Sequence, residues 1–147
     1  MATIEDVAAL TDLRLAFLAE VSTAPAEAET RTAILEYFSQ AIPAGEFVAY
    51  IAVARSRIIA TSGLVTHVHP PSSFHPTGRE AYIMNMYTDP AWRRRGIATK
   101  LVQMLIDHGR QNGCDRISLH THPQGRSIYT KAGFSPIETE MRLTLQK

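Results

Sequence analysis

The feature that most constrains the fold is an amphipathic helix that opens at Gly96, between two segments with strand character. Residues 81–88 and 116–121 are rich in the apolar and β-branched residues that strands favour. Between them, apolar side chains recur at helical spacing, and Gly113 can end the helix. These side chains are Ala98, Leu101, Val102, Leu105 and Ile106. A strand–helix–strand unit of this kind predicts an α/β or α+β fold with a mixed central sheet.

Two helices are predicted at the start of the chain. Thr3 and Asp6 can cap the first, and Val7, Leu10 and Phe17 lie on its apolar face. Pro25 suits the first turn of the second helix. With the central helix and a short one near the end of the chain, about four helices are expected to flank the sheet.

A β-hairpin and a long loop are predicted next. Residues 46–55 and 58–65 are rich in Val and Ile, and Ser56 and Arg57 separate them. Residues 66–80 hold several prolines, glycines and histidines, which is typical of a loop.

The end of the chain predicts two short elements. Residues 125–132 have the character of a helix, with Gly133 at its end. Residues 138–145 alternate as a final strand, whose edge can pair with a second copy in a homodimer.

Composition narrows the class of protein. A length of 147 residues fits a single domain over residues 1–147. The formal net charge of +1 creates no global field toward nucleic acid or membrane. The single cysteine, Cys114, excludes a disulfide within the chain, so a cytoplasmic setting is the simplest expectation.

The turn that leads into the Gly96 helix has the character of an anion site. Arg93, Arg94 and Arg95 bring positive charge, and Gly96 and Ala98 let an anion approach the backbone. The first N–H groups of a helix have no intrahelical partners, and the helix dipole adds positive charge there. A pyrophosphate cradle is therefore plausible. The alternative is a capped helix with a solvated basic turn.

Residues 93–98 (Arg-Arg-Arg-Gly-Ile-Ala) resemble the Arg/Gln-x-x-Gly-x-Gly/Ala signature of the GNAT acetyltransferases. Residues 128–134, with Tyr129 followed after three residues by Gly133 and Phe134, resemble the second signature of that family. The resemblance implies a GNAT-like fold that transfers acetyl from acetyl-CoA to an amine. The family usually has a strand before its first helix, and none is evident in this sequence.

The resemblance also implies which residues bind acetyl-CoA. The backbone N–H groups of the signature would hold the pyrophosphate, and the strand ending at Thr88 would pair with the pantetheine arm. His122 stands where the family often has an asparagine, and it either contacts that arm or only ends the strand. The implied cofactor-binding residues are Met86, Tyr87, Thr88, Arg93, Arg94, Arg95, Gly96, Ile97, Ala98, Thr99 and His122.

Three residues are candidates for catalysis. Tyr129 resembles the family's general acid, which reprotonates the departing thiolate. Some members use a strand glutamate as general base, and Tyr82 occupies that position here. The base is then Glu80, a histidine, or a water held by polar groups such as Asn85. Asn85 either binds the acceptor or ties the sheet together.

Functions other than acetyl transfer are also compatible with parts of this sequence. The domain can instead bind acyl-CoA as a sensor or interaction module with little turnover. Three arginines alone are a poor footprint for nucleic acid. The pairs His67/His69 and His120/His122 lack the usual companions of a zinc site, so no metal is expected. The acceptor is expected to be the amine of a small molecule or a peptide.

Overall fold

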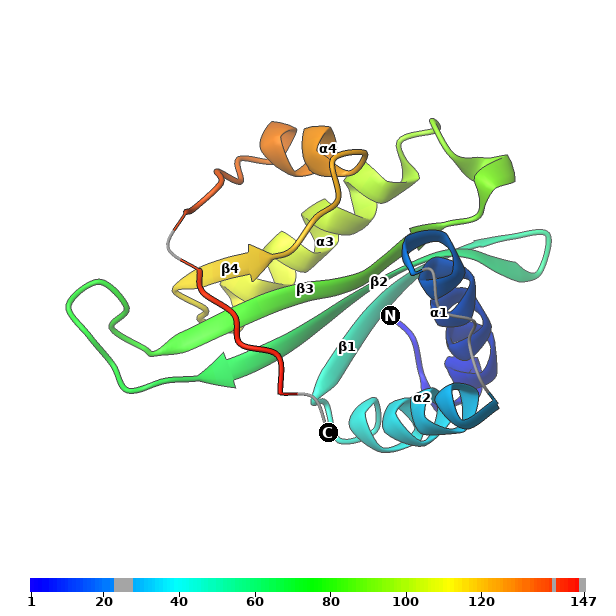
Figure 1. Cartoon of the computed structure of the whole chain (residues 1–147), viewed down its shortest axis with the longest axis horizontal. Helices are drawn as coiled ribbons and strands as arrows, with labels where there is room; N and C mark the ends of the chain where they lie inside the picture. Colours follow the sequence, from blue (N-terminus) through cyan, green and yellow to red (C-terminus); the bar gives the residue numbers. More distant parts are fainter. Residues whose placement is uncertain (23–27, 139, 146–147) are drawn as a thin grey trace.

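The computed structural model describes residues 1–22, 28–138 and 140–145 (Figure 1). Two short 3-10 turns, Ile4–Asp6 and Pro90–Trp92, accompany the longer elements. The helices and strands are α1 (Val7–Val21), α2 (Ala28–Ala41), β1 (Phe47–Ala54), β2 (Arg57–Val68), β3 (Arg79–Thr88), α3 (Ile97–Gln111), β4 (Arg116–Leu119) and α4 (Arg126–Lys131). The predicted α/β architecture, with a mixed sheet and four helices, is confirmed.

The sheet has the strand order β1-β2-β3-β4. β1, β2 and β3 form an antiparallel meander, and β4 pairs with β3 in parallel through the crossover helix α3. Figure 1 shows α1 and α2 together at one end of the sheet and α3 running behind the strands.

Side-chain alternation along β3 divides the core into two layers. Tyr82 and Met84 pack toward the cluster that contains Leu10 of α1 and Phe38 of α2. Ile83 belongs to the cluster beneath α3. Successive residues of a strand point to opposite faces, so the two helix pairs cover opposite faces of the sheet.

The predicted hairpin is confirmed, with its turn one residue earlier than expected. Ala54 pairs with Arg57, which leaves Arg55 and Ser56 as the loop. Their φ angles are 51° and 59°. Positive φ at both central residues is typical of a type I′ turn, whose twist matches the two strands.

The start of the chain follows the prediction. The Thr3 side chain accepts a hydrogen bond from the Glu5 N–H and Asp6 accepts one from the Thr3 N–H, which forms a capping box before α1. The Ala2 N–H donates to the Ala49 carbonyl at 2.8 Å, but no strand precedes α1 in the part of the chain that is described. The expected position of Pro25 lies outside the described residues.

The predicted final strand is wrong for the residues that can be checked. Glu138 and residues 140–145 form no strand, and residue 139 lies outside the described chain. Met141, Leu143 and Leu145 are 97%, 83% and 87% exposed. A strand needs a hydrogen-bonded neighbour, and none of the described strands pairs with this segment. Within the described residues, no helix has the length and apolar character needed to cross a membrane.

Candidate active site

The central feature of the site is an opening between β3 and β4. The two strands pair only from Glu80–Ile83 to Arg116–Leu119, while β3 continues to Thr88. Figure 1 shows the chain after β4 turning away from β3 toward α4. Beyond Ile83, β3 therefore has a described strand neighbour on one side only, which is β2. A free strand edge can take an extended ligand as an added strand.

A bulge in β3 lies at this opening. Gly63 of β2 pairs with Met84 and Thr61 pairs with Tyr87, so Asn85 and Met86 together oppose Ser62. The backbone of Asn85 has a φ of 59°, a left-handed conformation that asparagine tolerates better than most residues. The bulge bends the strand and changes which face its side chains occupy.

The turn into α3 has the backbone geometry that an anion cradle requires. Gly96 is the N-cap of α3 with a φ of 77°, and no side chain caps the helix. The first intrahelical bond runs from the Lys100 N–H to the Gly96 carbonyl at 3.0 Å. A Cβ on Gly96 would meet nothing within 4 Å, so the space in front of the turn is open. The unpaired N–H groups of the first turn can therefore reach an anion.

The three arginines of the turn differ in their contacts. The Arg93 guanidinium donates to the Thr88 carbonyl at 2.9 Å and pairs with Glu20 at 2.5 Å. Arg95 stacks over the Trp92 ring at 4.8 Å. Arg94 is exposed and makes no such contact with the described residues. Arg93 and Arg95 therefore shape the turn, whereas the Arg94 side chain is free to meet a ligand.

Tyr129 of α4 lies on the other side of the opening. Its side chain is buried with Val102 and Ile106 of α3, and Met86 of β3 packs against the same cluster. Burial raises the pKa of Tyr129 to about 12. Its hydroxyl makes no hydrogen bond to the described residues. The structure thus brings together the predicted acid and a predicted pantetheine-binding residue, 43 positions apart in the sequence.

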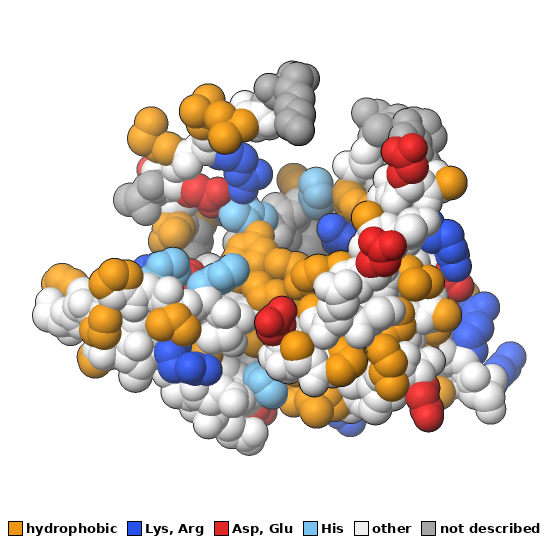
Figure 2. All heavy atoms as spheres, turned by 90° about the horizontal axis from the view of Figure 1, so that it is seen from below, with side chains coloured by type: hydrophobic (Ala, Val, Ile, Leu, Met, Phe, Trp, Pro, Cys, Tyr) orange, Lys and Arg blue, Asp and Glu red, His pale blue; other side chains and the backbone are white. Residues whose placement is uncertain are grey.

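A cavity of about 350 Å³ lies between the sheet and the first two helices. Asn85 of β3 and Arg14 of α1 contribute polar groups to it, and Phe47 of β1 contributes an aromatic wall. The full lining is Arg14, Thr30, Ala33, Ile34, Tyr37, Phe38, Phe47, Met84 and Asn85. Figure 2 shows one face of the molecule hollowed between two raised parts, with hydrophobic side chains on the floor. This cavity, which reaches β3 at Met84 and Asn85, is large enough to be a candidate acceptor site.

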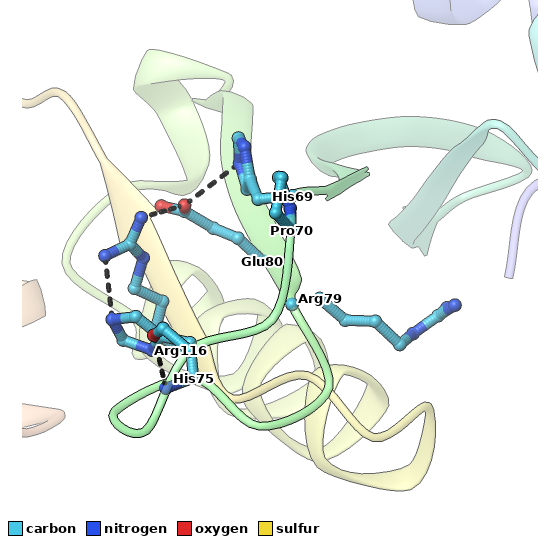
Figure 3. Close-up of a pocket in the computed structure, with 8 residues that line it drawn as sticks. His69, Pro70, His75, Arg79, Glu80 and Arg116 are labelled. Atoms are coloured by element: carbon cyan, nitrogen blue, oxygen red, sulfur yellow. Dashed lines mark hydrogen bonds and ion pairs between the residues drawn. The ribbon is translucent and has the colours of Figure 1, made fainter.

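Glu80 lies in a smaller pocket of about 50 Å³, at the start of β3 (Figure 3). Its carboxylate accepts hydrogen bonds from Arg116 at 2.5 Å and from Ser118 at 2.6 Å, and it lies 3.5 Å from His69. Burial alone would raise the pKa of Glu80, but these hydrogen bonds and positive charges outweigh it and lower the pKa. An ion-paired carboxylate with a lowered pKa is a weak base, so the structure gives Glu80 little basic character.

Figure 3 shows that Arg116 bridges Glu80 and His75 within the same pocket. Arg79, although it also lines the pocket, points away from this cluster. The cluster therefore joins the loop before β3 to β4, and its contacts are those of a structural ion-pair network.

A polar chain that the sequence did not predict lies beyond Tyr82. The Tyr82 hydroxyl is hydrogen-bonded to Nδ1 of His120, and the other ring nitrogen of His120 contacts Glu140. Arg142 also contacts that ring nitrogen and the Glu140 carboxylate. Tyr82 occupies the position where the family resemblance placed a glutamate base, and that position was the only available sequence signal for this chain of contacts.

His122 is exposed in the turn before α4. Its carbonyl accepts the Gly125 N–H at 3.0 Å, which closes that turn. The described contacts of His122 involve its backbone only, so contact of its side chain with a pantetheine arm stays a prediction. Within the described chain, no three His, Cys, Asp or Glu side chains gather in a way that could hold a metal ion.

Comparison with known proteins places this geometry in a family. The profile of the "Acetyltransferase (GNAT) family" matches residues 8–134. A solved structure from Clostridium acetobutylicum, described as a predicted acetyltransferase with acetyl-CoA, is 29% identical, with a TM-score of 0.90 over 97% of this chain and 92% of that chain. A GCN5-related N-acetyltransferase from Ralstonia eutropha JMP134 is 26% identical, with a TM-score of 0.84 over 98% and 95% of the two chains.

Curated relatives match this chain at similar identity, one of them only in part. Glucosamine 6-phosphate N-acetyltransferase 1 of Oryza sativa subsp. japonica is 30% identical over 66 residues, which is 45% of this chain and 40% of the rice protein. The alignment thus spans less than half of the rice enzyme. Glucosamine 6-phosphate N-acetyltransferase of Trypanosoma brucei brucei is 28% identical over 92% of this chain and 98% of that protein. The family profile covers most of the chain, and this protein belongs to the GNAT acetyltransferase family.

Proposed function

We propose that this protein transfers an acetyl group from acetyl-CoA to a primary amine. The observation that carries the proposal is the opening between β3 and β4, which the uncapped first turn of α3 and the buried Tyr129 both border. These three features correspond to the three parts of acetyl-CoA that need a partner: an extended arm, a pyrophosphate and a sulfur.

The residues present fit acetyl-CoA. The backbone N–H groups of residues 94–99 would hold the pyrophosphate, and the open space over Gly96 leaves room for it. The free edge of β3 beyond Ile83, which includes Met86 and Thr88, would pair with the pantetheine arm. Acetyl-CoA supplies the acetyl group as a thioester, so the new N–C bond forms as the C–S bond breaks and one proton passes from the amine to the sulfur.

Direct attack by the amine is the route that the side chains support. Cys114 packs against the cluster beneath α3 together with Ile117 and Phe134, and no basic side chain is hydrogen-bonded to it among the described residues. Without an activated nucleophile, an acyl-enzyme is disfavoured. The protein then acts chiefly by holding the amine and the thioester in a reactive orientation.

Tyr129 would donate a hydrogen bond to the departing sulfur of CoA. A phenol with a pKa of about 12 keeps its proton throughout the physiological range, so it is always available as a hydrogen-bond donor. Full transfer of that proton to a thiolate with a pKa near roughly 8.5 is uphill. We therefore assign Tyr129 a hydrogen bond that stabilises the thiolate. The released thiolate then takes up a proton from water, which balances the proton that the amine loses.

The amine must also lose a proton. The Tyr82–His120–Glu140 chain lies on β3 and beyond β4, and a histidine held between a phenol and a carboxylate is suited to moving a proton. We propose this chain, in contact with water, as the proton acceptor in preference to Glu80, whose pKa is lowered by Arg116 and Ser118. A His120→Gln variant should lower kcat while acetyl-CoA binding is unchanged, and Glu80→Gln should lower kcat less.

A turnover assay with an amine panel tests the function. The panel contains glucosamine 6-phosphate, because relatives named for that substrate match this chain, together with amino acids, aryl-alkyl amines and a short peptide. Release of free CoA thiol that depends on one of these amines would support the proposal. Acetyl-CoA binding without amine-dependent release for any compound would instead identify an acyl-CoA-binding module.

A further inference from the structure

The acceptor cavity contains a cationic side chain without an anionic partner. Arg14 of α1 lines the cavity, and its guanidinium lies 5.4 Å from the centre of the Phe17 ring. It forms no ion pair with any described residue. Burial lowers the pKa of Arg14, yet an arginine keeps its charge in proteins. A half-buried charge of this kind is costly unless a ligand compensates it.

Other arginines of the same helical region are compensated. Arg31 of α2 pairs with Asp12 of α1 at 2.7 Å, and Arg93 pairs with Glu20 at the end of α1. The side chains of both pairs are more than 40% exposed. Arg14 is thus less exposed to water than these arginines, yet no described carboxylate neutralises it. Stability alone would favour the opposite arrangement, in which the more buried charge is the paired one.

Asn85 provides a second, independent observation. Its residue is only 4% exposed, and neither Oδ1 nor Nδ2 has a hydrogen-bond partner in the described structure. Buried amides of proteins are nearly always paired. Because Asn85 lines the same cavity as Arg14, both groups can be satisfied by one ligand with polar atoms at two ends.

The remaining walls of the cavity indicate the chemical character of the middle part of that ligand. The apolar and aromatic lining residues are Ala33, Ile34, Tyr37, Phe38, Phe47 and Met84. A polyhydroxylated body would leave hydroxyl groups without hydrogen-bond partners against such walls, which is unfavourable. An apolar body of modest size suits them better.

We propose that the acceptor is an amine with an apolar body and one anionic group, a carboxylate or a phosphate-type group. Arg14 binds the anion, and the Asn85 amide, next to Met86, binds the polar end that carries the amine. This inference rests on the proposed acetyl transfer and names its substrate class. Arginine suits both anions because its planar guanidinium can donate two parallel hydrogen bonds.

Binding and turnover test the inference separately. The binding probes are 3-phenylpropionate, 2-phenylethylphosphonate and the neutral 3-phenylpropionamide, titrated by calorimetry into protein saturated with CoA. The turnover probes are phenylalanine, its phosphonic acid analogue and phenylalaninamide. The variants are Arg14→Gln and, as a matched control, Arg31→Gln, which removes the same charge from the neighbouring exposed ion pair.

We expect the acids to bind at least about tenfold more tightly than the amide, and Arg14→Gln to erase that difference. Arg14→Gln should raise KM for the acidic amines at least about tenfold and leave phenylalaninamide unaffected. The carboxylate and phosphonate arms identify which anion is preferred. Arg31→Gln should behave as the wild type.

Equal affinity for acids and amide, no binding by any of the three probes, or equal losses in both variants would overturn the inference. Failure of the acetyltransferase proposal has a different signature: acetyl-CoA would either not bind to the wild-type protein, or would bind and release no CoA thiol with any amine, neutral or acidic. If acetyl-CoA binds and neutral amines are acetylated as well as acidic ones, only the anionic acceptor is wrong.

Discussion

The Phe47 ring lies directly over Gly63 of β2, where a Cβ would stand 2.2 Å from the Cζ atom of that ring. The missing side chain on β2 therefore creates the space in which Phe47 forms a wall of the acceptor cavity. The absence of a side chain at Gly63, in the middle of the sheet, therefore helps to set the shape of the cavity.

Gly63→Ala should displace Phe47 and destabilise the protein by about 1–3 kcal/mol, as expected for an overpacked core. Urea unfolding of Gly63→Ala, Phe47→Leu and the double variant measures the coupling. Because leucine is shorter than phenylalanine, the alanine should cost less in the Phe47→Leu background. Additive effects in the double variant would contradict the contact.

Tyr129→Phe should lower kcat about 100-fold and leave the affinity for acetyl-CoA within about twofold, since only a donor to the sulfur is removed. Stability should change little, because the hydroxyl has no described hydrogen-bond partner. With a pKa of about 12, Tyr129 should produce no break in the wild-type pH–rate profile between about pH 6 and 10. Tyr50→Phe removes a phenolic hydroxyl elsewhere and serves as the control. Wild-type activity in Tyr129→Phe would refute the assignment.

Arg94 and Arg93 should differ in their effect on acetyl-CoA binding. Glu20 already neutralises Arg93, whereas Arg94 is exposed with no described partner. Arg94→Gln should weaken binding several-fold and reduce its dependence on salt, and Arg93→Gln should do so less. Calorimetric titrations at low and high salt measure both quantities. A larger loss in Arg93→Gln would show that the shape of the turn matters more than its free charge.

His108 should make stability depend on pH. Its Nδ1 lies 3.2 Å from the Tyr50 hydroxyl, and burial lowers its pKa below the ordinary 6.5. The unfolded chain then takes up this proton at a higher pH than the folded chain. The contribution of neutral His108 to stability is thus complete above about pH 6.5 and is lost as the pH falls through the lower folded pKa.

Denaturant titrations between about pH 5 and 8 check this behaviour. His108→Gln should flatten the acidic part of the stability profile relative to the wild type. Identical profiles for the wild type and His108→Gln would show that other groups set the pH dependence.

Much of the fold follows from the sequence because its strongest signals are local. The apolar stripe of α3 and the capping box at Thr3 and Asp6 depend on neighbours along the chain. The prediction of a final strand was wrong because the alternation of residue types at residues 138–145 does not show whether a neighbouring strand is available for pairing. The hairpin turn moved by one residue because the register, from Phe47 with Val65 to Ala54 with Arg57, decides which residues form the loop.

Candidate site residues could be named from the sequence where they are consecutive in the chain. They could not be named where residues far apart in the sequence meet in the fold. The residues proposed for the cradle at Gly96 form one continuous motif, so the sequence alone is enough to name them. The pairing of Glu80 with Arg116 depends on the parallel register of β3 and β4, which no sequence pattern encodes. The cavity that joins Arg14 to Asn85 depends on how α1 packs against the bulge, and an unpartnered charge is visible only when its surroundings are known.

The central claim is that the turn at Gly96 holds the pyrophosphate of acetyl-CoA, and a calorimetric titration tests it most directly. The wild type, Gly96→Ala and Gly96→Glu are compared. Because Gly96 has a φ of 77°, both variants carry the same backbone strain, of about 1–2 kcal/mol, and only the glutamate adds a repelling charge. Binding by the wild type that weakens moderately in Gly96→Ala and disappears in folded Gly96→Glu is the predicted result. Unchanged binding in Gly96→Glu, or no binding by the folded wild type, would contradict the account.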